Sequence, residues 1–276
     1  MTRKQALAKF QSELHVSYSQ IFTYLNCPLK FKFQYVENRP AERVSIALVF
    51  GSAIHSAIER YYYSLTNKGI VEPFEAIYEA FEDSFETELS KREVPIIYKK
   101  ETPNQKSAIE TGKGLLKAFY DGIDLTGFEI VAIELPLTAR LYTDEKQPTE
   151  LILTGIVDLL LKDIKGNLIA VDHKTAKQSY AQETVDEDLQ MTSYAYLLAS
   201  NKYIFPTADV HCRFDVMRKL KTPKFEQYYT VRTATHRRRF AKLTNAILAG
   251  IDAKIFMPNR TWLCSDCQFI GACEAW

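Results

Sequence analysis

Two apolar runs separated by a short polar turn stand in the middle of the chain. Residues 155–161 and 169–175 each carry an acid among aliphatic side chains, and the stretch Asp-Ile-Lys-Gly-Asn at 163–167 lies between them. Apolar runs of this length around a Gly/Asn turn predict a β-hairpin. Gly166 suits the left-handed position that closes a three-residue hairpin loop.

The register of this hairpin decides which polar side chains meet. With the turn centred on Lys165, Asp158 falls opposite Asp172, and we expect the two carboxylates on one face. Side chains alternate along a strand, so Asp172 and Lys174 point one way and His173 the other. The hairpin therefore presents two acids and one ammonium from a surface that is otherwise aliphatic.

Hydrophobic periodicity predicts the remaining elements. A helix is expected to begin at Ser17, whose side chain forms a capping box with Gln20. Further helices are expected over 47–65, 74–92, 105–120, 185–200 and 235–251, and strands over 128–142, 151–161, 208–217 and 225–232.

Burying the acids of the hairpin is costly unless they are paired or bind a metal. One interpretation is a structural ion pair between an aspartate and Lys174. The other is a divalent-cation site, because carboxylate oxygens suit Mg²⁺ or Mn²⁺. Lys174 would then orient an attacking water or stabilise charge on a scissile phosphate. We favour the metal site, and we interpret Glu134 as a surface acid at a strand end, with membership of the site as the alternative.

The tail of the chain holds Cys264, Cys267 and Cys273 in a C-x2-C-x5-C array. A structural zinc or an iron–sulfur cluster needs four such ligands. The fourth must come from Cys27 or Cys212. Cys212 alternates inward in a predicted strand and is interpreted as a core residue, so Cys27 is chosen, which would join the two ends of the chain. Trp262, Phe269 and Trp276 are expected to shield the site.

Composition adds little to this picture. The chain has 276 residues, 46% of them hydrophobic, and a formal net charge of +1, so any contact with nucleic acid must be local. The basic runs at 213–221 and 236–239 are candidate phosphate contacts or solvated surface. No stretch predicts a membrane span and the start lacks the apolar core of a secretory signal, so we expect a cytoplasmic protein with reduced thiols.

Asp158 followed by Asp172-x-Lys174 across a hairpin resembles the core of the PD-(D/E)XK nucleases. Gly-x-x-Asp at 155–158 and Asp-x-Lys-Thr at 172–175 are similar to their RecB-like branch. The resemblance implies a restriction-endonuclease-like α/β fold, with a mixed β-sheet core flanked by helices. One domain over 1–276 would comprise three parts, namely a mainly helical part at 16–125, a nuclease core at 126–232, and a C-terminal helix with the cysteines at 233–276.

The same resemblance assigns roles to further residues. A Gly-x-x-x-His helix upstream of the hairpin supplies a metal-binding imidazole, here His55, and the backbone carbonyl of His173 is a further metal ligand. Gln190 and Tyr194 match a Gln-x-x-x-Tyr motif that lines the site and handles the DNA strand. The family commonly has an aromatic or apolar residue where His173 stands.

The cysteine pattern resembles that of RecB-like exonucleases of the AddB kind and that of the CRISPR-associated single-strand exonucleases. They have one Cys before the core and C-x2-C-x5-C after it, which implies a [4Fe–4S] cluster on Cys27, Cys264, Cys267 and Cys273. Zinc in the same four sites is the alternative.

The expected function is a Mg²⁺- or Mn²⁺-dependent exonuclease that acts on single-stranded DNA with 5′-to-3′ polarity, beside a separate helicase or other DNA-processing partner. A catalytically silent DNA-binding or scaffold module of the same fold is the alternative, and the intact set of site residues argues against it. A redox protein is disfavoured because no flavin or nucleotide signature accompanies the cysteines.

Overall fold

The computed structural model of the protein describes residues 15–100, 102–143 and 147–276. A six-stranded mixed sheet runs through its centre, and a two-stranded sheet lies apart from it. The strands of the main sheet are β1 (His15–Ser17), β4 (Phe128–Tyr142), β5 (Pro148–Asp163), β6 (Leu168–Ala176), β7 (Val210–Arg218) and β8 (Lys224–Arg232); β2 (Val44–Ser45) pairs with β3 (Ile96–Ile97).

The long strand β5 organises the main sheet because three strands pair with it. β4 runs antiparallel along nearly its whole length. β1 pairs parallel with residues 152–154, and β6 pairs antiparallel with residues 159–162. Since β4 occupies one edge of β5, β1 and β6 pair with two different segments of its other edge. The sheet then continues through β7, parallel to β6, and β8, antiparallel to β7.

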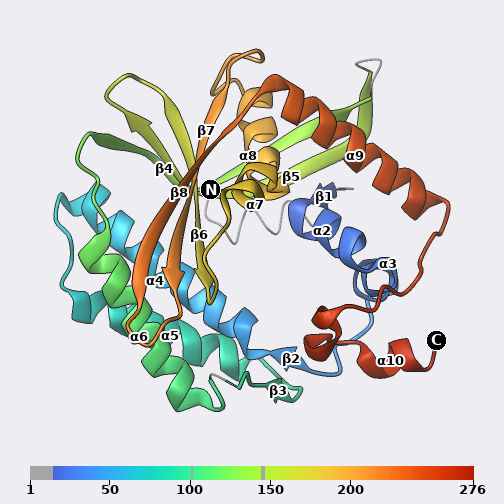
Figure 1. Ribbon diagram of the computed structural model, residues 1–276, viewed down its shortest axis with the longest axis horizontal. Helices are drawn as coiled ribbons and strands as arrows, with labels where there is room; N and C mark the ends of the chain where they lie inside the picture. The colour runs from blue at the N-terminus through green and yellow to red at the C-terminus, as the bar shows by residue number, and fades with distance from the viewer. Residues whose placement is uncertain (1–14, 101, 144–146) are drawn as a thin grey trace.

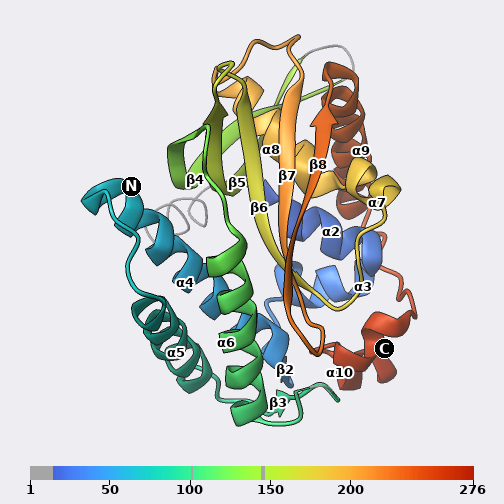
Figure 2. The same ribbon diagram turned by 60° about the vertical axis from the view of Figure 1, so that its left-hand side comes forward.

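Helices cover both faces of the sheet, as Figures 1 and 2 show. The helices α4 (Ile46–Lys68), α5 (Phe74–Ser90) and α6 (Gln105–Gly122) build one hydrophobic core against it. The other core joins the sheet to α2 (Tyr18–Asn26), α8 (Leu189–Ser200) and α9 (Ala234–Asp252). The predicted mixed sheet flanked by helices is confirmed, and no helix in the described ranges is long and apolar enough to cross a membrane.

Most predicted elements agree with the structure, and one is wrong. The strand predicted over 128–142 has those bounds, and Ser17 forms the capping box with Gln20. The single helix predicted over 185–200 is instead two helices, α7 (Gln182–Glu187) and α8. Asp188 separates them in an extended conformation and caps α8, because its side chain accepts a hydrogen bond from the backbone N–H of Met191 at 2.9 Å. Aspartate is a strong N-cap residue, and here capping interrupts the helical periodicity.

Two charged positions that could have contacted phosphate are buried instead. Arg213, on the central strand β7, is inaccessible and pairs with Asp215, which is also inaccessible. Arg237 on α9 is 5% exposed and donates to the backbone carbonyls of Pro206 and Ala208. Expecting a phosphate contact or a solvated surface at these two arginines is therefore wrong.

A segment near the N-terminus and the C-terminal segment lie side by side (Figure 1). α3 (Pro28–Phe31) and a π-helix at Lys32–Val36 meet a 3-10 helix at Trp262–Asp266 and α10 (Ile270–Glu274). Leu29, Phe33 and Phe269 form a small separate core between them. The backbone N–H of Leu29 donates to the carbonyl of Met257 at 3.1 Å, so main-chain contacts also join the ends.

Candidate metal centre and cysteine site

The candidate centre lies where β5 and β6 separate. Their pairing ends at Leu159 and Val171, so the next residues, Asp158 and Asp172, face each other across the start of a fork. One edge of β5 is free of strand partners between 154 and 159, among the residues that the structure describes. Instead of a ladder bond, the backbone N–H of His173 donates to Oδ2 of Asp158 at 2.9 Å. The predicted register is therefore confirmed.

Asp172 is held by three side chains on the α8 side of the fork. It is 1% exposed, and Nζ of Lys174 lies 2.7 Å from its Oδ2. Its Oδ1 accepts hydrogen bonds from Nε2 of Gln190 at 2.7 Å and from the hydroxyl of Tyr194 at 3.0 Å. Gln190 also accepts from Lys174 at 2.7 Å, so its amide links the acid to the ammonium. The Gln-x-x-x-Tyr pair predicted to line the site does contact it.

Asp158 turns toward α4 instead. Its Oδ2 lies 3.4 Å from Nδ1 of His55 and 3.6 Å from Nδ1 of His173. Asp158 and Asp172 are opposite each other and close enough for the charge of Asp158 to act on Asp172. The side chain of Asp158 contacts α4, and that of Asp172 contacts α8.

His55, Glu134 and Asp158 form the one group among the described residues whose ligand atoms all lie within 4.8 Å of one another. One imidazole nitrogen and two carboxylate oxygens are donors that suit Mn²⁺ and, through the oxygens, Mg²⁺. The donor set of these three residues thus fits a divalent cation. Asp172 borders the group from the other side of the fork.

Glu134 is the residue that the sequence interpretation placed at the surface, with membership of the site only as the alternative. It is 5% exposed, and its neighbours in β4 pair with the neighbours of Asp158 in β5, so the two acids are opposite each other. Its φ of 48° lies in the left-handed region that side chains rarely adopt, and such strain is concentrated at functional sites. The interpretation as a surface acid is wrong. An acid amid alternating apolar residues was the signal, but the register between β4 and β5 could not be set from sequence.

Burial and neighbouring charges shift the pKa values of the two aspartates at the fork in opposite directions. Burial, together with the charge of Asp158, raises the pKa of Asp172 to about 6, against the opposing attraction of Lys174. Burial also acts to raise the pKa of Asp158, but the attraction of His55, His173 and Lys174 outweighs it and lowers that pKa. Burial acts to lower the pKa of Lys174, and the two aspartates reverse this, so it remains an ammonium.

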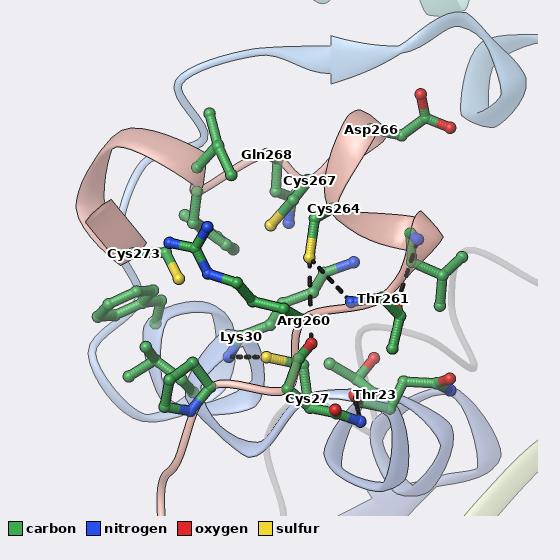
Figure 3. Close-up of a pocket in the computed structure, with 18 of the residues that line it drawn as sticks. Thr23, Cys27, Lys30, Arg260, Thr261, Cys264, Asp266, Cys267, Gln268 and Cys273 are labelled. Carbon is green, nitrogen blue, oxygen red and sulfur yellow. Dashed lines mark hydrogen bonds between the residues drawn. The ribbon is translucent and has the colours of Figure 1, made fainter. Parts of the chain in front are cut away.

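The four predicted cysteines line one cavity at the junction of the chain ends. In Figure 3 the sulfurs of Cys27, Cys264, Cys267 and Cys273 turn toward a common space, which Arg260 also enters. Burial and the charges of the three other cysteines raise the pKa of Cys273. Cys212 is fully buried in the sheet core, as expected.

The aromatic shield predicted for the cysteines is only partly present. Phe269 is 2% exposed and packs in the small core, whereas Trp262 is 81% exposed and Trp276 is 62% exposed. The expectation for the two tryptophans is wrong: Trp262 begins a short 3-10 helix, Trp276 follows the end of α10, and both side chains are exposed. Polar contacts hold the loops instead. For example, the carboxylate of Glu42 accepts from the backbone N–H groups of Gly271 and Ala272 at 2.9 and 2.8 Å.

A mixed sheet flanked by helices, with acids and a lysine at the fork of its central hairpin, is the architecture of a PD-(D/E)XK nuclease. The family model described as the PD-(D/E)XK nuclease superfamily matches residues 15–274. This chain belongs to that superfamily.

One solved structure shares this fold at low sequence identity. A crystal structure of a "Putative exonuclease" from Eubacterium rectale superposes with a TM-score of 0.59 at 11% identity, covering 97% of this chain and 92% of that one. A crystal structure of SSO0001 gives a TM-score of only 0.38 at 12% identity, covering 90% of this chain and 94% of that one. No curated protein matches the chain.

Proposed function

We propose that this protein is a Mg²⁺- or Mn²⁺-dependent DNA exonuclease that hydrolyses phosphodiester bonds. The observation that carries the proposal is the fork, where a three-donor group of His55, Glu134 and Asp158 lies beside Asp172 and Lys174. Membership of the nuclease superfamily supports it. We further propose that 1–276 acts as a single domain.

The donor group would hold the cation, with Asp172 and the backbone carbonyl of His173 as further ligands. A bound cation supplies Lewis-acid stabilisation of the phosphate and a more acidic water. Nζ of Lys174 lies 2.7 Å from Asp172, whose charge helps to raise the pKa of Lys174, so Lys174 would serve as a hydrogen-bond donor and a positive charge. It would position water for in-line attack and stabilise the charge that develops on the phosphate.

Gln190 and Tyr194 keep Lys174 and Asp172 in place through their hydrogen bonds. Single-stranded DNA, exonucleolytic cleavage and 5′-to-3′ polarity are proposed from the resemblance to RecB-like nucleases. The description of the Eubacterium rectale protein as an exonuclease favours the same mode. A helicase or another DNA-processing protein would supply the strand, in the cytoplasm.

We propose a structural [4Fe–4S] cluster on Cys27, Cys264, Cys267 and Cys273. One Cys before the core and C-x2-C-x5-C after it resemble the pattern of cluster-bearing RecB-like exonucleases, which favours the cluster over zinc. Iron analysis and a visible spectrum of anaerobically purified protein test this proposal.

The test of the nuclease is cleavage of end-labelled single-stranded DNA with Mn²⁺. We expect Lys174→Ala to lower the rate about 10²–10³-fold, the scale for removing one charge-stabilising donor. Lys165→Ala is the matched control, because Lys165 lies on the exposed turn of the same hairpin. If wild-type protein prepared anaerobically cleaves nothing, the silent DNA-binding module becomes the better account.

A further inference from the structure

Resting on the proposed function, we propose that the imidazole of His173 is a positioning group for the metal ligand Asp158, and that a buried polar chain through Tyr62, Asp215 and Arg213 orients that imidazole. This role belongs to the side chain of His173 and is separate from that of its backbone carbonyl.

The geometry places the imidazole between two acids. Nδ1 faces Oδ2 of Asp158 at 3.6 Å, slightly longer than a hydrogen bond, and such contacts at active sites commonly tighten when the site is loaded. Nε2 lies 3.4 Å from the hydroxyl of Tyr62 and 3.9 Å from Oδ2 of Asp215. The side chain of His173 is 2% exposed, so these groups, and not water, surround its two nitrogens.

The two nitrogens of the imidazole face different groups, Nδ1 toward Asp158 and Nε2 toward Tyr62 and Asp215. Arg213 binds Asp215 through two contacts, at 2.7 and 2.8 Å, and neutralises that carboxylate. The hydroxyl of Tyr62 lies 3.4 Å from Nε2 and can donate to it when the ring hydrogen is on Nδ1. In that tautomer the hydrogen on Nδ1 faces Oδ2 of Asp158. His173 would thus hold Oδ2 of Asp158 with both its backbone and its side chain.

The packing around His173 argues against a purely structural role. Its ring centroid lies 5.6 Å from that of Tyr62 and 6.1 Å from that of Phe119, which is an aromatic enclosure. A phenyl group would suit such an enclosure without the cost of burying polar nitrogens. A role in orienting the metal ligand Asp158 would account for a buried histidine here, next to Arg213 and Asp215. Groups that orient metal ligands contribute about 10- to 100-fold in metal affinity or activity.

Three substitutions at one position separate the functions of the ring. His173→Asn keeps an amide N–H close to the place of Nδ1, whereas His173→Gln extends its amide toward the place of Nε2. His173→Phe keeps an aromatic ring but removes both nitrogens. Mn²⁺ binding to the full chain, purified anaerobically with its iron, is measured by the EPR signal of free Mn²⁺, and the melting temperature is recorded for each variant.

We expect His173→Phe and His173→Gln to weaken Mn²⁺ binding about 10- to 100-fold, and His173→Asn to stay within about threefold of wild type. The melting temperature of His173→Phe should not fall, since an apolar ring replaces a polar one. Tyr62→Phe should weaken binding by a smaller factor, and should add nothing in the presence of His173→Phe, because both act through one chain.

Wild-type affinity in His173→Phe would overturn the inference and leave the proposed nuclease intact. A parallel fall of Mn²⁺ affinity and melting temperature in all three variants would also overturn it, because a merely structural histidine behaves in this way. Failure of the wild-type protein itself to bind Mn²⁺ would remove the proposed function, and the inference with it.

Discussion

The fork and the cysteine site differ in how they are built. At the fork, every polar group comes from a long strand or helix, and the aspartates are 8% and 1% exposed. Their partners already hold them in place. The cysteines come from short helices and loops, are partly exposed, and rest on a core of only three buried side chains.

This difference has a physical consequence. The fork is preorganised by the two large cores on either side of the sheet, so the protein alone fixes its geometry. The junction of the chain ends has only a small apolar core and is held in part by polar contacts, so a bound cluster would add a further constraint, as structural metals do in small domains. We therefore expect a substitution that impairs one site to leave the other site intact.

The largest effect should follow Asp158→Asn. It keeps the size of the side chain and removes the charge that His55 and a cation require, so we expect the cleavage rate to fall about 10³-fold or more. Iron content should match the wild type. A simultaneous loss of iron would show that the two sites are coupled and would contradict their expected independence.

Cys273→Ser should have the next largest effect, on the other site. We expect the iron content to fall close to zero and the melting temperature to fall by about 2–4 °C for each kcal/mol lost. Mn²⁺ affinity at the fork should be retained. Cys212→Ala is the control, because Cys212 is buried in the sheet core and should lose stability while keeping iron. Iron retained in Cys273→Ser would contradict the assignment of the ligands.

Glu134→Gln tests the residue that completes the donor group. We expect Mn²⁺ to bind about 10- to 100-fold more weakly, with little change in folding, because the amide keeps the shape of the side chain. Glu129→Gln, an exposed position on the same strand, should bind Mn²⁺ normally. Equal affinities in the two variants would exclude Glu134 from the site.

The smallest effect is expected for Trp262→Ala. Its side chain is 81% exposed, so its removal should leave the iron content unchanged and the stability within about 0.5 kcal/mol of wild type. Chemical denaturation and iron analysis measure both quantities. A marked loss of iron would mean that the tryptophan covers the cysteines when they are loaded.

Local patterns predicted the parts of the site that lie close together in sequence. The hairpin register depends on one short turn, so Asp158, Asp172 and Lys174 could be placed from sequence alone. Glu134 could not, because its position depends on pairing across a longer connection between β4 and β5. The buried pair of Arg213 and Asp215 was missed for a related reason, since a charged run gives no sign that its strand is covered on both faces.

The division of the predicted helix at Asp188 is another feature that the hydrophobic pattern could not predict. The periodicity of 185–200 is helical throughout, and only the competing preference of aspartate for a cap ends one helix and begins the next. At the chain ends, cysteine spacing predicted which residues gather, but the exposure of the tryptophans depends on tertiary packing that spacing does not encode.

The most direct test of the central claim is a crystal structure of the protein soaked with Mn²⁺, with anomalous scattering used to locate the ion. The account predicts an anomalous peak at the fork, bonded to His55, Glu134 and Asp158, and absent in Asp158→Asn. A peak bonded to other residues, or an empty fork at saturating Mn²⁺ in a protein that cleaves DNA, would contradict it.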